Sequence, residues 1–518
     1  MINIADNITG FYEWLLASAL YDPGHPMFFT GAFFIFFFLL FFLVYLPLSR
    51  LPQGRALVIL FFSLWFYYKC SGPFVLIIMA AGTFNYLIAR ILKASGKTKK
   101  RTFLFFGAIV INLSVLVLFK YTPWFTRLAE LIASGSWNFA YLVFPAGLSF
   151  YTFANLSYII DVYKRVLPPE HSLLKYLTYI TFFPIVQMGP IERAKNFLPQ
   201  LSQPFRLSQE DVSAGLFLIL SGAMKKMVIG DYVNLHLVSQ VFSTPERYTG
   251  MENLAALLGY SLVIYCDFSG YTDMARGVAR WMGFNIQVNF NFPYRSESIG
   301  EFWRRWHISL SNWLRDYLFL PLAFRLSGMM KREYMFAQNY IRTDLIIFSI
   351  ASLITFTICG LWHGFGLNFL VWGLMHGVAL SVQKSWSYAT RNLKKGRSQG
   401  FKKINKAAGI ILTFAFVSVA WVFFRMRTMD ESFTVFSQIA ANFYPQGLLP
   451  FIKAYYPVLL MIATGYGLHI IPEGVYTKLR QLLLPMGWGW KAVIAVLFVT
   501  VIVYFRSLGS AMPIYIQF

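Results

Sequence analysis

Long uncharged runs recur along almost the whole of this chain. The first extends from Phe28 to Leu48 and is long enough to cross a bilayer, which takes about 20 apolar residues. Charged residues make up only 13% of the chain, about half of their usual share in a soluble domain. The sequence therefore predicts an all-α integral membrane protein rather than a series of soluble domains.

About twelve such runs are predicted to be transmembrane helices. Their approximate ranges are 28–48, 56–70, 74–92, 103–119, 140–160, 211–229, 253–268, 345–361, 368–383, 407–424, 453–471 and 490–507. Residues 173–190 are apolar but contain Pro184, which favours a broken or re-entrant segment. Residues 269–343 are long, aromatic and charged, and a segment of this size between spans is seldom an idle loop.

The net charge of +23 comes from Lys and Arg that gather in short loops. Residues 93–101 and 384–406 are the most basic of these loops, so both are expected on the cytoplasmic side. Residues 1–26 carry acidic residues and no Lys or Arg, so they are expected outside. The same charge suits anionic lipid headgroups. Because no separate basic domain exists, nucleic acid is not an expected partner.

The segment 302–317, FWRRWHISLSNWLRDY, has two faces when it is read as one helix. Its aromatic face holds Trp303, Trp306, Leu310, Trp313, Leu314 and Tyr317, with His307 at the edge. Its polar face holds Arg305, Ser309, Asn312 and Asp316, flanked by Arg304 and Arg315. Two interpretations stay open: an interfacial helix with its tryptophans among the headgroups, or a site where paired arginines hold the phosphates of a cytoplasmic donor.

His363 lies in GLWHG, 360–364, directly after an apolar run. Ionisable groups at membrane depth are costly, so the default interpretation is functional. A buried imidazole is expected to stay neutral, and it can then take the proton of a hydroxyl that attacks an activated carbonyl. Gly360, Gly364 and Gly366 would permit a close backbone approach or a kink. The alternative is a histidine hydrogen-bonded to a neighbouring span, which is favoured for His376.

Motifs that are typical of serine hydrolases, zinc proteases and nucleotide-binding proteins are absent from this sequence. There is no GxSxG elbow, no HExxH, no P-loop and no GxGxxG. The three cysteines, Cys70, Cys266 and Cys359, form no CxxC pair or disulfide framework. They are expected to be buried, with a catalytic thiol at Cys359 as an alternative. No metal or bound cofactor is expected.

These motifs together resemble the membrane-bound O-acyltransferase (MBOAT) family. The resemblance is to its bacterial branch, whose members acetylate alginate or peptidoglycan or export D-alanine to teichoic acid. It covers roughly residues 56–425 and rests on the segments 144–164, 189–201, 222–231, 265–284, 289–317, 360–364 and 421–425. Residues 319–342 look more like the D-alanine exporters, whereas WVFFR (421–425) and the spans after it look like the acetylating members.

The resemblance implies a single polytopic membrane domain over 1–518, with an MBOAT core at 56–425 and additional C-terminal spans at 426–518. In that fold, transmembrane, re-entrant and interfacial helices surround a central tunnel in a bacterial cytoplasmic (inner) membrane. The catalytic histidine maps onto His363. A second histidine or asparagine of the same tunnel maps onto His307, which could hydrogen-bond the thioester carbonyl or orient the arm of the donor.

The resemblance also implies the substrates. The donor is an acyl thioester, on coenzyme A or on the phosphopantetheine of a carrier protein. The acceptor is a hydroxyl of an extracytoplasmic glycan or partner protein. Five residues are candidates for donor binding: Arg304, Arg305, Arg315, Asn312 and Trp306. Acetyl is the first choice of acyl group and D-alanyl the second. A lipid-linked sugar transporter is the alternative from another class, although no inverted repeat is visible.

Overall fold

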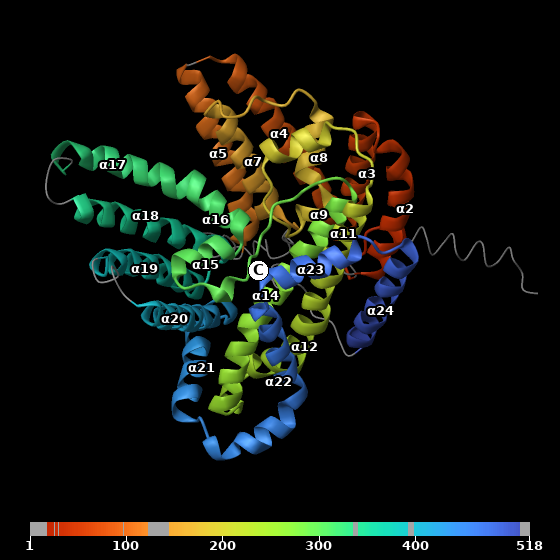
Figure 1. Ribbon diagram of the computed structural model, residues 1–518. Coiled ribbons are helices and arrows are strands. Elements are labelled where there is room, and N and C mark those ends of the chain that lie inside the picture. The colour runs from red at the N-terminus through yellow and green to blue at the C-terminus, as the bar shows by residue number, and fades with distance from the viewer. Residues whose placement is uncertain are drawn as a thin grey trace, which may run out of the picture. The chain divides into compact units, whose positions relative to one another are not determined.

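The computed structural model describes residues 18–24, 26–29, 31–96, 98–122, 145–334, 340–391 and 398–507. Over these residues the regular elements are helices of the α, 3-10 and π types (Figure 1). Eight helical stretches among them are long and apolar enough to cross a membrane. The prediction of an all-α integral membrane protein is therefore confirmed.

Each predicted span falls mainly on helix over its described residues. The helices are α2 (Ala32–Leu48), α3 (Pro52–Ser71), α4 (Val75–Ala94), α5 (Lys99–Lys120), α7 (Leu148–Tyr163), α11 (Gln209–Ala223), α14 (Gly250–Trp281), α18 (Tyr340–His363), α19 (Leu367–Ala389), α20 (Gln399–Arg425), α22 (Leu448–Ile470) and α24 (Trp488–Ser507). How many of them cross the bilayer stays a prediction. Residues 1–17, 140–144 and 392–397 lie outside the described residues.

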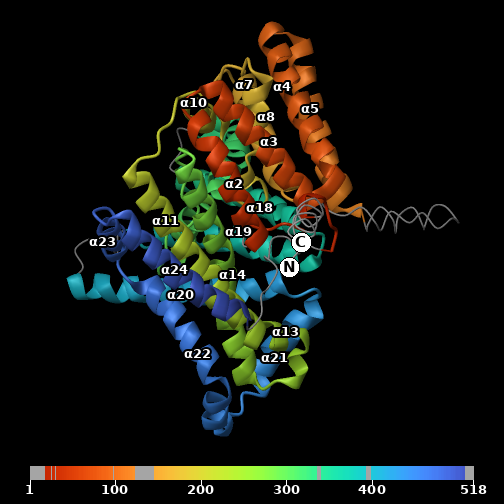
Figure 2. The same cartoon turned by 90° about the vertical axis from the view of Figure 1, so that its right-hand side faces the viewer.

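The chain divides into two compact units, and the first comprises Met1–Gly215 with Ala275–Ile286. Its helices α2 and α3 lie side by side, as do α4 and α5 (Figure 2). Between α7 and α11 the chain forms three short helices, α8 (Leu173–Thr181), α9 (Phe183–Val186) and α10 (Ala194–Leu201).

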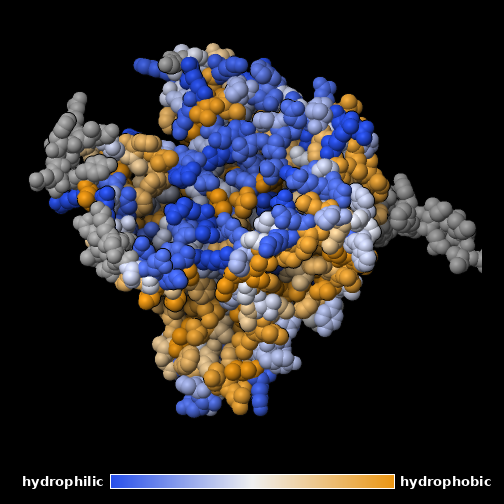
Figure 3. Space-filling view, in the orientation of Figure 1, coloured by the Kyte–Doolittle hydropathy of each residue, from blue (hydrophilic) through white to orange (hydrophobic). Residues whose placement is uncertain are grey.

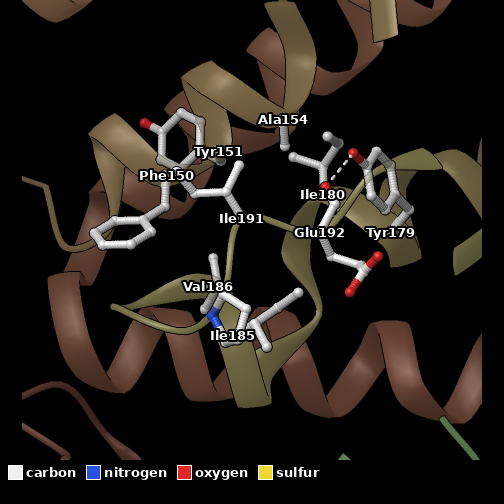
Figure 4. A pocket seen from close by; sticks show the side chains of 10 residues that line it. Phe150, Tyr151, Ala154, Tyr179, Ile180, Ile185, Val186, Ile191 and Glu192 are labelled. Atoms are coloured by element: carbon white, nitrogen blue, oxygen red, sulfur yellow. Dashed lines mark hydrogen bonds between the residues drawn. The ribbon is translucent and has the colours of Figure 1, made fainter. Parts of the chain in front are cut away.

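The predicted break within residues 173–190 is confirmed. The chain leaves the helical conformation at Phe182, between α8 and α9. The broken segment packs closely on the start of α7, because a Cβ atom on Gly147 would lie 1.8 Å from the carbonyl oxygen of Val186. A cavity of about 20 Å³ beside it is lined by residues that include Tyr179 and Glu192 (Figure 4). That volume holds a single water molecule, so this cavity cannot accommodate an acyl donor.

Arg55 on α3 joins three parts of the first unit. Its side chain is 1% exposed, and its guanidinium donates to the carbonyl oxygens of Gln200 and Gln203 at 2.8 Å and of Met282 at 2.7 Å. Its Nε donates to the hydroxyl of Tyr45 at 3.0 Å. A buried cation held by backbone oxygens thus fixes α3 against the chain after α10 and the end of α14.

The second unit comprises Leu216–Met274 with Gln287–Phe518. In it, α18, α19 and α20 lie side by side, and α17 (Leu320–Tyr334) packs on α18 (Figure 1). The short helices α15 (Ile299–Arg305) and α16 (Ile308–Leu314) precede them, and α21 (Met429–Ala441), α22, α23 (Glu473–Leu483) and α24 follow. Apolar side chains cover the exposed surface of α21 and α22 (Figure 3), including Leu449 and Leu460. That surface suits contact with lipid tails.

We expect Arg55→Met to lower the stability of the protein by about 2 kcal/mol, because it removes the charged donor that hydrogen-bonds to the carbonyl oxygens of Gln200, Gln203 and Met282. Thermal unfolding in detergent would measure the loss as a lower Tm. Arg50→Met is the matched control, since Arg50 is exposed and its substitution removes the same charge. Equal melting temperatures for the two variants would contradict this account of Arg55.

Candidate active site

His363 is the last residue of α18, and its side chain is 5% exposed. Three aromatic rings surround its imidazole. The ring centroids of Trp362, Phe424 and Trp372 lie 4.4, 4.8 and 5.1 Å from that of His363. The histidine at the end of this apolar helix is therefore enclosed by protein.

Two glycines set the distance between α18 and α19. A Cβ atom on Gly360 would lie 2.2 Å from the carbonyl oxygen of Phe369, and one on Gly373 would lie 2.2 Å from that of Phe356. Gly364 lies against the Phe369 ring, which its Cβ would meet at 2.2 Å. At Gly366 the nearest contact of a Cβ would be an ordinary 3.6 Å. The predicted close backbone approach is confirmed for Gly360. At Gly364 the close neighbour is a side-chain ring, and Gly366 has no close neighbour.

Asn368, at the start of α19, is hydrogen-bonded to the backbone that follows the WVFFR motif, and we call this contact the Asn368 clamp. The Asn368 amide donates to the carbonyl oxygens of Met426 at 2.8 Å and Thr428 at 2.9 Å. Both oxygens lie directly after the end of α20. This clamp places Phe424 against the imidazole.

The segment 302–317 is not one helix, so that prediction is wrong. α15 ends at Arg305, Trp306 is extended, and His307 has the left-handed conformation, with φ 41° and ψ 54°. The break follows from pairing with an extended stretch. The Asn291 N–H donates to the carbonyl oxygen of Arg305, and the Ile308 N–H to that of Asn289, both at 2.9 Å. These bonds replace helical bonds across the break.

Most residues of the predicted aromatic face are buried together despite the break. The predicted polar face does not form, because one of its members is buried as well. The buried members are Trp303, Trp306, Leu310, Trp313 and Leu314. Ser309, expected on the polar face, is only 2% exposed. Its backbone N–H and its hydroxyl both donate to the side-chain oxygen of Asn289, at 3.0 and 2.9 Å. The tryptophans therefore contribute to the protein core rather than to a lipid-facing belt.

His307 is 1% exposed, and Phe268 packs edge-to-face on its imidazole, with the two ring centroids 4.6 Å apart. Its Nδ1 is 3.2 Å from the side-chain oxygen of Asn289. Burial lowers the pKa of His307 to about 3. The imidazole is therefore neutral at physiological pH, because burial penalises the charged form.

One aromatic cluster connects the two histidines. From His363, Phe424 is followed by Trp421 at 5.4 Å, and Trp421 by Trp306 at 4.9 Å. Trp306 directly precedes His307. The WVFFR motif alone does not indicate that Trp421 and Phe424 lie between the two histidines. Aromatic residues within a motif next to a histidine were the signal that could have found them.

The five candidate donor-binding residues occupy different environments. Arg305 pairs with Glu301 at 2.8 Å, and Arg315 with Asp316 at 2.9 Å, whereas Arg304 is exposed. Burial raises the pKa of Glu301, but the Glu297 N–H and then Arg305 and Arg304 bring it below its ordinary value, so Glu301 is ionised. Asn312 is half-buried, and Trp306 is 2% exposed within the aromatic cluster.

His376 and Cys359, the remaining histidine and cysteine candidates, have surroundings typical of structural residues. The Trp303 indole donates to Nδ1 of His376 at 3.3 Å, so His376 is bonded to a neighbouring helix. Cys359 is buried. Over the residues that the structure describes, no group of His, Cys, Asp and Glu is arranged to hold a metal ion.

Two ion pairs, Lys226 with Asp267 and Lys225 with Asp273, join α14 to the π-helix η2 (Met224–Gly230), which continues from α11. The ammonium of Lys226 lies 2.6 Å from both Asp231 and Asp267, and Lys225 pairs with Asp273. Charges within a membrane-spanning stretch are costly unless they are paired. These pairs therefore hold the two stretches together in one register.

Comparison with known proteins identifies relatives over most of the chain. The membrane-bound O-acyltransferase family matches residues 162–337 and 348–426. The chain is 31% identical to a peptidoglycan O-acetyltransferase of Helicobacter pylori, over 75% of this chain and 74% of that protein. It is 33% identical to a probable alginate O-acetylase of Pseudomonas aeruginosa (78% and 72%). It is 28% identical to a teichoic acid D-alanyltransferase of Bacillus subtilis (62% and 78%).

We expect Gly360→Ala to destabilise the protein by about 1–3 kcal/mol, because the new methyl group would press α19 away from α18. A lower Tm in detergent would report the effect. Gly366→Ala is the control, since Gly366 precedes α19 and a methyl group has room there, and its Tm should equal that of the unaltered protein. A Gly360→Ala protein as stable as the Gly366→Ala protein would disprove the assigned role of the close contact.

Proposed function

This chain belongs to the membrane-bound O-acyltransferase family and is an O-acyltransferase, and we propose that it carries an acyl group from a cytoplasmic thioester to an extracytoplasmic hydroxyl. The observation that supports this proposal is the placement of His363, enclosed by aromatic rings at the end of a membrane-spanning helix and joined through one cluster to the segment of His307. We propose the bacterial inner membrane as the location of this multi-pass protein.

In the proposed mechanism, His363 is the general base. Its neutral imidazole takes the proton of the acceptor hydroxyl while the oxygen attacks the carbonyl carbon of the thioester. The tetrahedral intermediate then expels the thiolate, and the imidazolium returns the proton to sulfur. An ester and a free thiol are the products. The apolar surroundings exclude water, which would otherwise compete as the acceptor.

Acetyl is the proposed acyl group, and an extracytoplasmic glycan or its partner protein is the proposed acceptor. The two O-acetylating relatives exceed 30% identity over about three quarters of this chain, whereas the D-alanyltransferase matches 62% of it. D-alanyl is the second candidate, favoured by the sequence of 319–342. The donor thioester is on coenzyme A or on carrier phosphopantetheine, and we propose that Arg304 and Arg315 bind its phosphates.

We expect His363→Ala to abolish thioester turnover in liposomes that contain the purified protein, because the acceptor hydroxyl loses its base. Free thiol release from acetyl-coenzyme A would be measured alongside ester formation on a glycan acceptor. His171→Ala is the control, since His171 is exposed, and it should retain turnover. Full activity in a folded His363→Ala protein would refute the catalytic assignment.

We expect Arg304→Ala and Arg315→Ala each to raise the KM for the donor by about 10-fold, which corresponds to about 1.4 kcal/mol of lost binding. The rate at saturating donor should change little, because the arginines bind phosphates and not the reacting carbonyl. Arg325→Ala on α17 removes an equally exposed charge and serves as the control. Donor KM values that match the control in both variants would rule out this phosphate site.

A further inference from the structure

Asn289 brings three donors to one buried oxygen next to His307. We propose that Asn289 is a positioning residue, which fixes the His307 imidazole with its proton on Nδ1 and its lone pair on Nε2. This inference rests on the proposed function only in assuming that His307 contacts the thioester donor. The geometry itself is independent of that assumption.

The orientation of the Asn289 amide is determined by Ser309. The backbone N–H of Ser309 can only donate, and the side-chain atom of Asn289 that lies 3.0 Å from it must therefore be the oxygen. The Ser309 hydroxyl donates to the same atom at 2.9 Å. The amide nitrogen of Asn289 has no hydrogen-bond partner among the described residues. The side chain is thus held as an acceptor, at the cost of an unsatisfied donor.

The tautomer of His307 follows from this orientation. An amide oxygen can only accept, so the Nδ1 atom 3.2 Å away must carry the proton. In a neutral imidazole, Nε2 then carries the lone pair. The Ile308 N–H also donates to the backbone carbonyl of Asn289 at 2.9 Å. Asn289 therefore holds both the left-handed backbone of His307 and its ring.

The neutral side chain of Asn289 matters as much as its geometry. An aspartate could accept the same bonds, but its charge would favour the imidazolium. The charged residues nearest in sequence to the ring and its Phe268 neighbour are Asp267, next to Phe268 on α14, and Arg305, two residues before His307 on α15. They are paired with Lys226 and Glu301, respectively. An amide at position 289 thus leaves the ring uncharged.

The fixed tautomer narrows the role of His307 in acyl transfer. Nε2 can accept a hydrogen bond but cannot donate one to the carbonyl oxygen of the thioester. Amide N–H groups along the pantetheine arm of a thioester donor have the complementary chemistry. Of the two roles expected from the sequence, orienting the arm of the donor is therefore the one that this geometry favours.

The first test reads the tautomer directly, without acyl transfer. Nitrogen NMR of the full chain, with 15N-labelled histidine in lipid bilayers, distinguishes protonated from bare ring nitrogens, and His307→Gln identifies the signals. We expect a protonated Nδ1 and a bare Nε2 at neutral pH. Ser309→Ala keeps the backbone N–H that donates to Asn289 and should give the same pattern. A protonated Nε2 in the unaltered protein would overturn the inference.

The second test changes position 289. Asn289→Asp should make His307 protonate about 1–3 pH units higher, so its imidazolium signal should appear at higher pH and the acid limb of kcat/KM should move with it. Asn289→Leu should give a mixture of tautomers and raise the donor KM more than it lowers kcat. Unchanged ring signals in both variants would refute the positioning role. If the wild-type protein shows the expected ring signals but no acyl transfer, the result would count against the proposed function alone.

Discussion

The contact between α18 and α19 at Gly360 and Gly373 is the constraint on which the proposed catalytic centre depends. Because each glycine lies against a backbone carbonyl of the opposite helix, the two helices cannot slide without a clash. His363 ends the first helix, and the Asn368 clamp begins the second. Phe424, Trp372 and the imidazole therefore keep their relative positions as long as this contact is intact.

Polar groups inside this protein are held mainly by specific partners. Arg55 is surrounded by carbonyl oxygens, and Lys226 by two carboxylates. Such groups gain little net stability over well-packed apolar residues, but they penalise every alternative packing in which a partner is lost. Apolar contacts between helices are less specific than these paired polar groups, so the paired groups are the features that define one register for each helix.

The sequence was sufficient for most of the helices but not for the geometry around His307. A long uncharged run is a local property, so the helices from α2 to α24 could be located from it. The end of α14 was missed, since its last turns are polar and hold half-buried ion pairs such as Lys225 with Asp273. The break at Trp306 was missed because its cause is the extended stretch near Asn289, which a helical reading of 302–317 does not include.

The left-handed backbone at residue 307 also limits what can evolve at that position. Only a few residue types other than glycine adopt this conformation readily, and asparagine, aspartate and histidine are the most enriched among them. An aspartate would bring an uncompensated charge into a buried position. Histidine and asparagine combine a preference for this backbone with a neutral hydrogen-bonding group. The backbone conformation at residue 307 thus restricts which side chains suit this position, independently of the reaction.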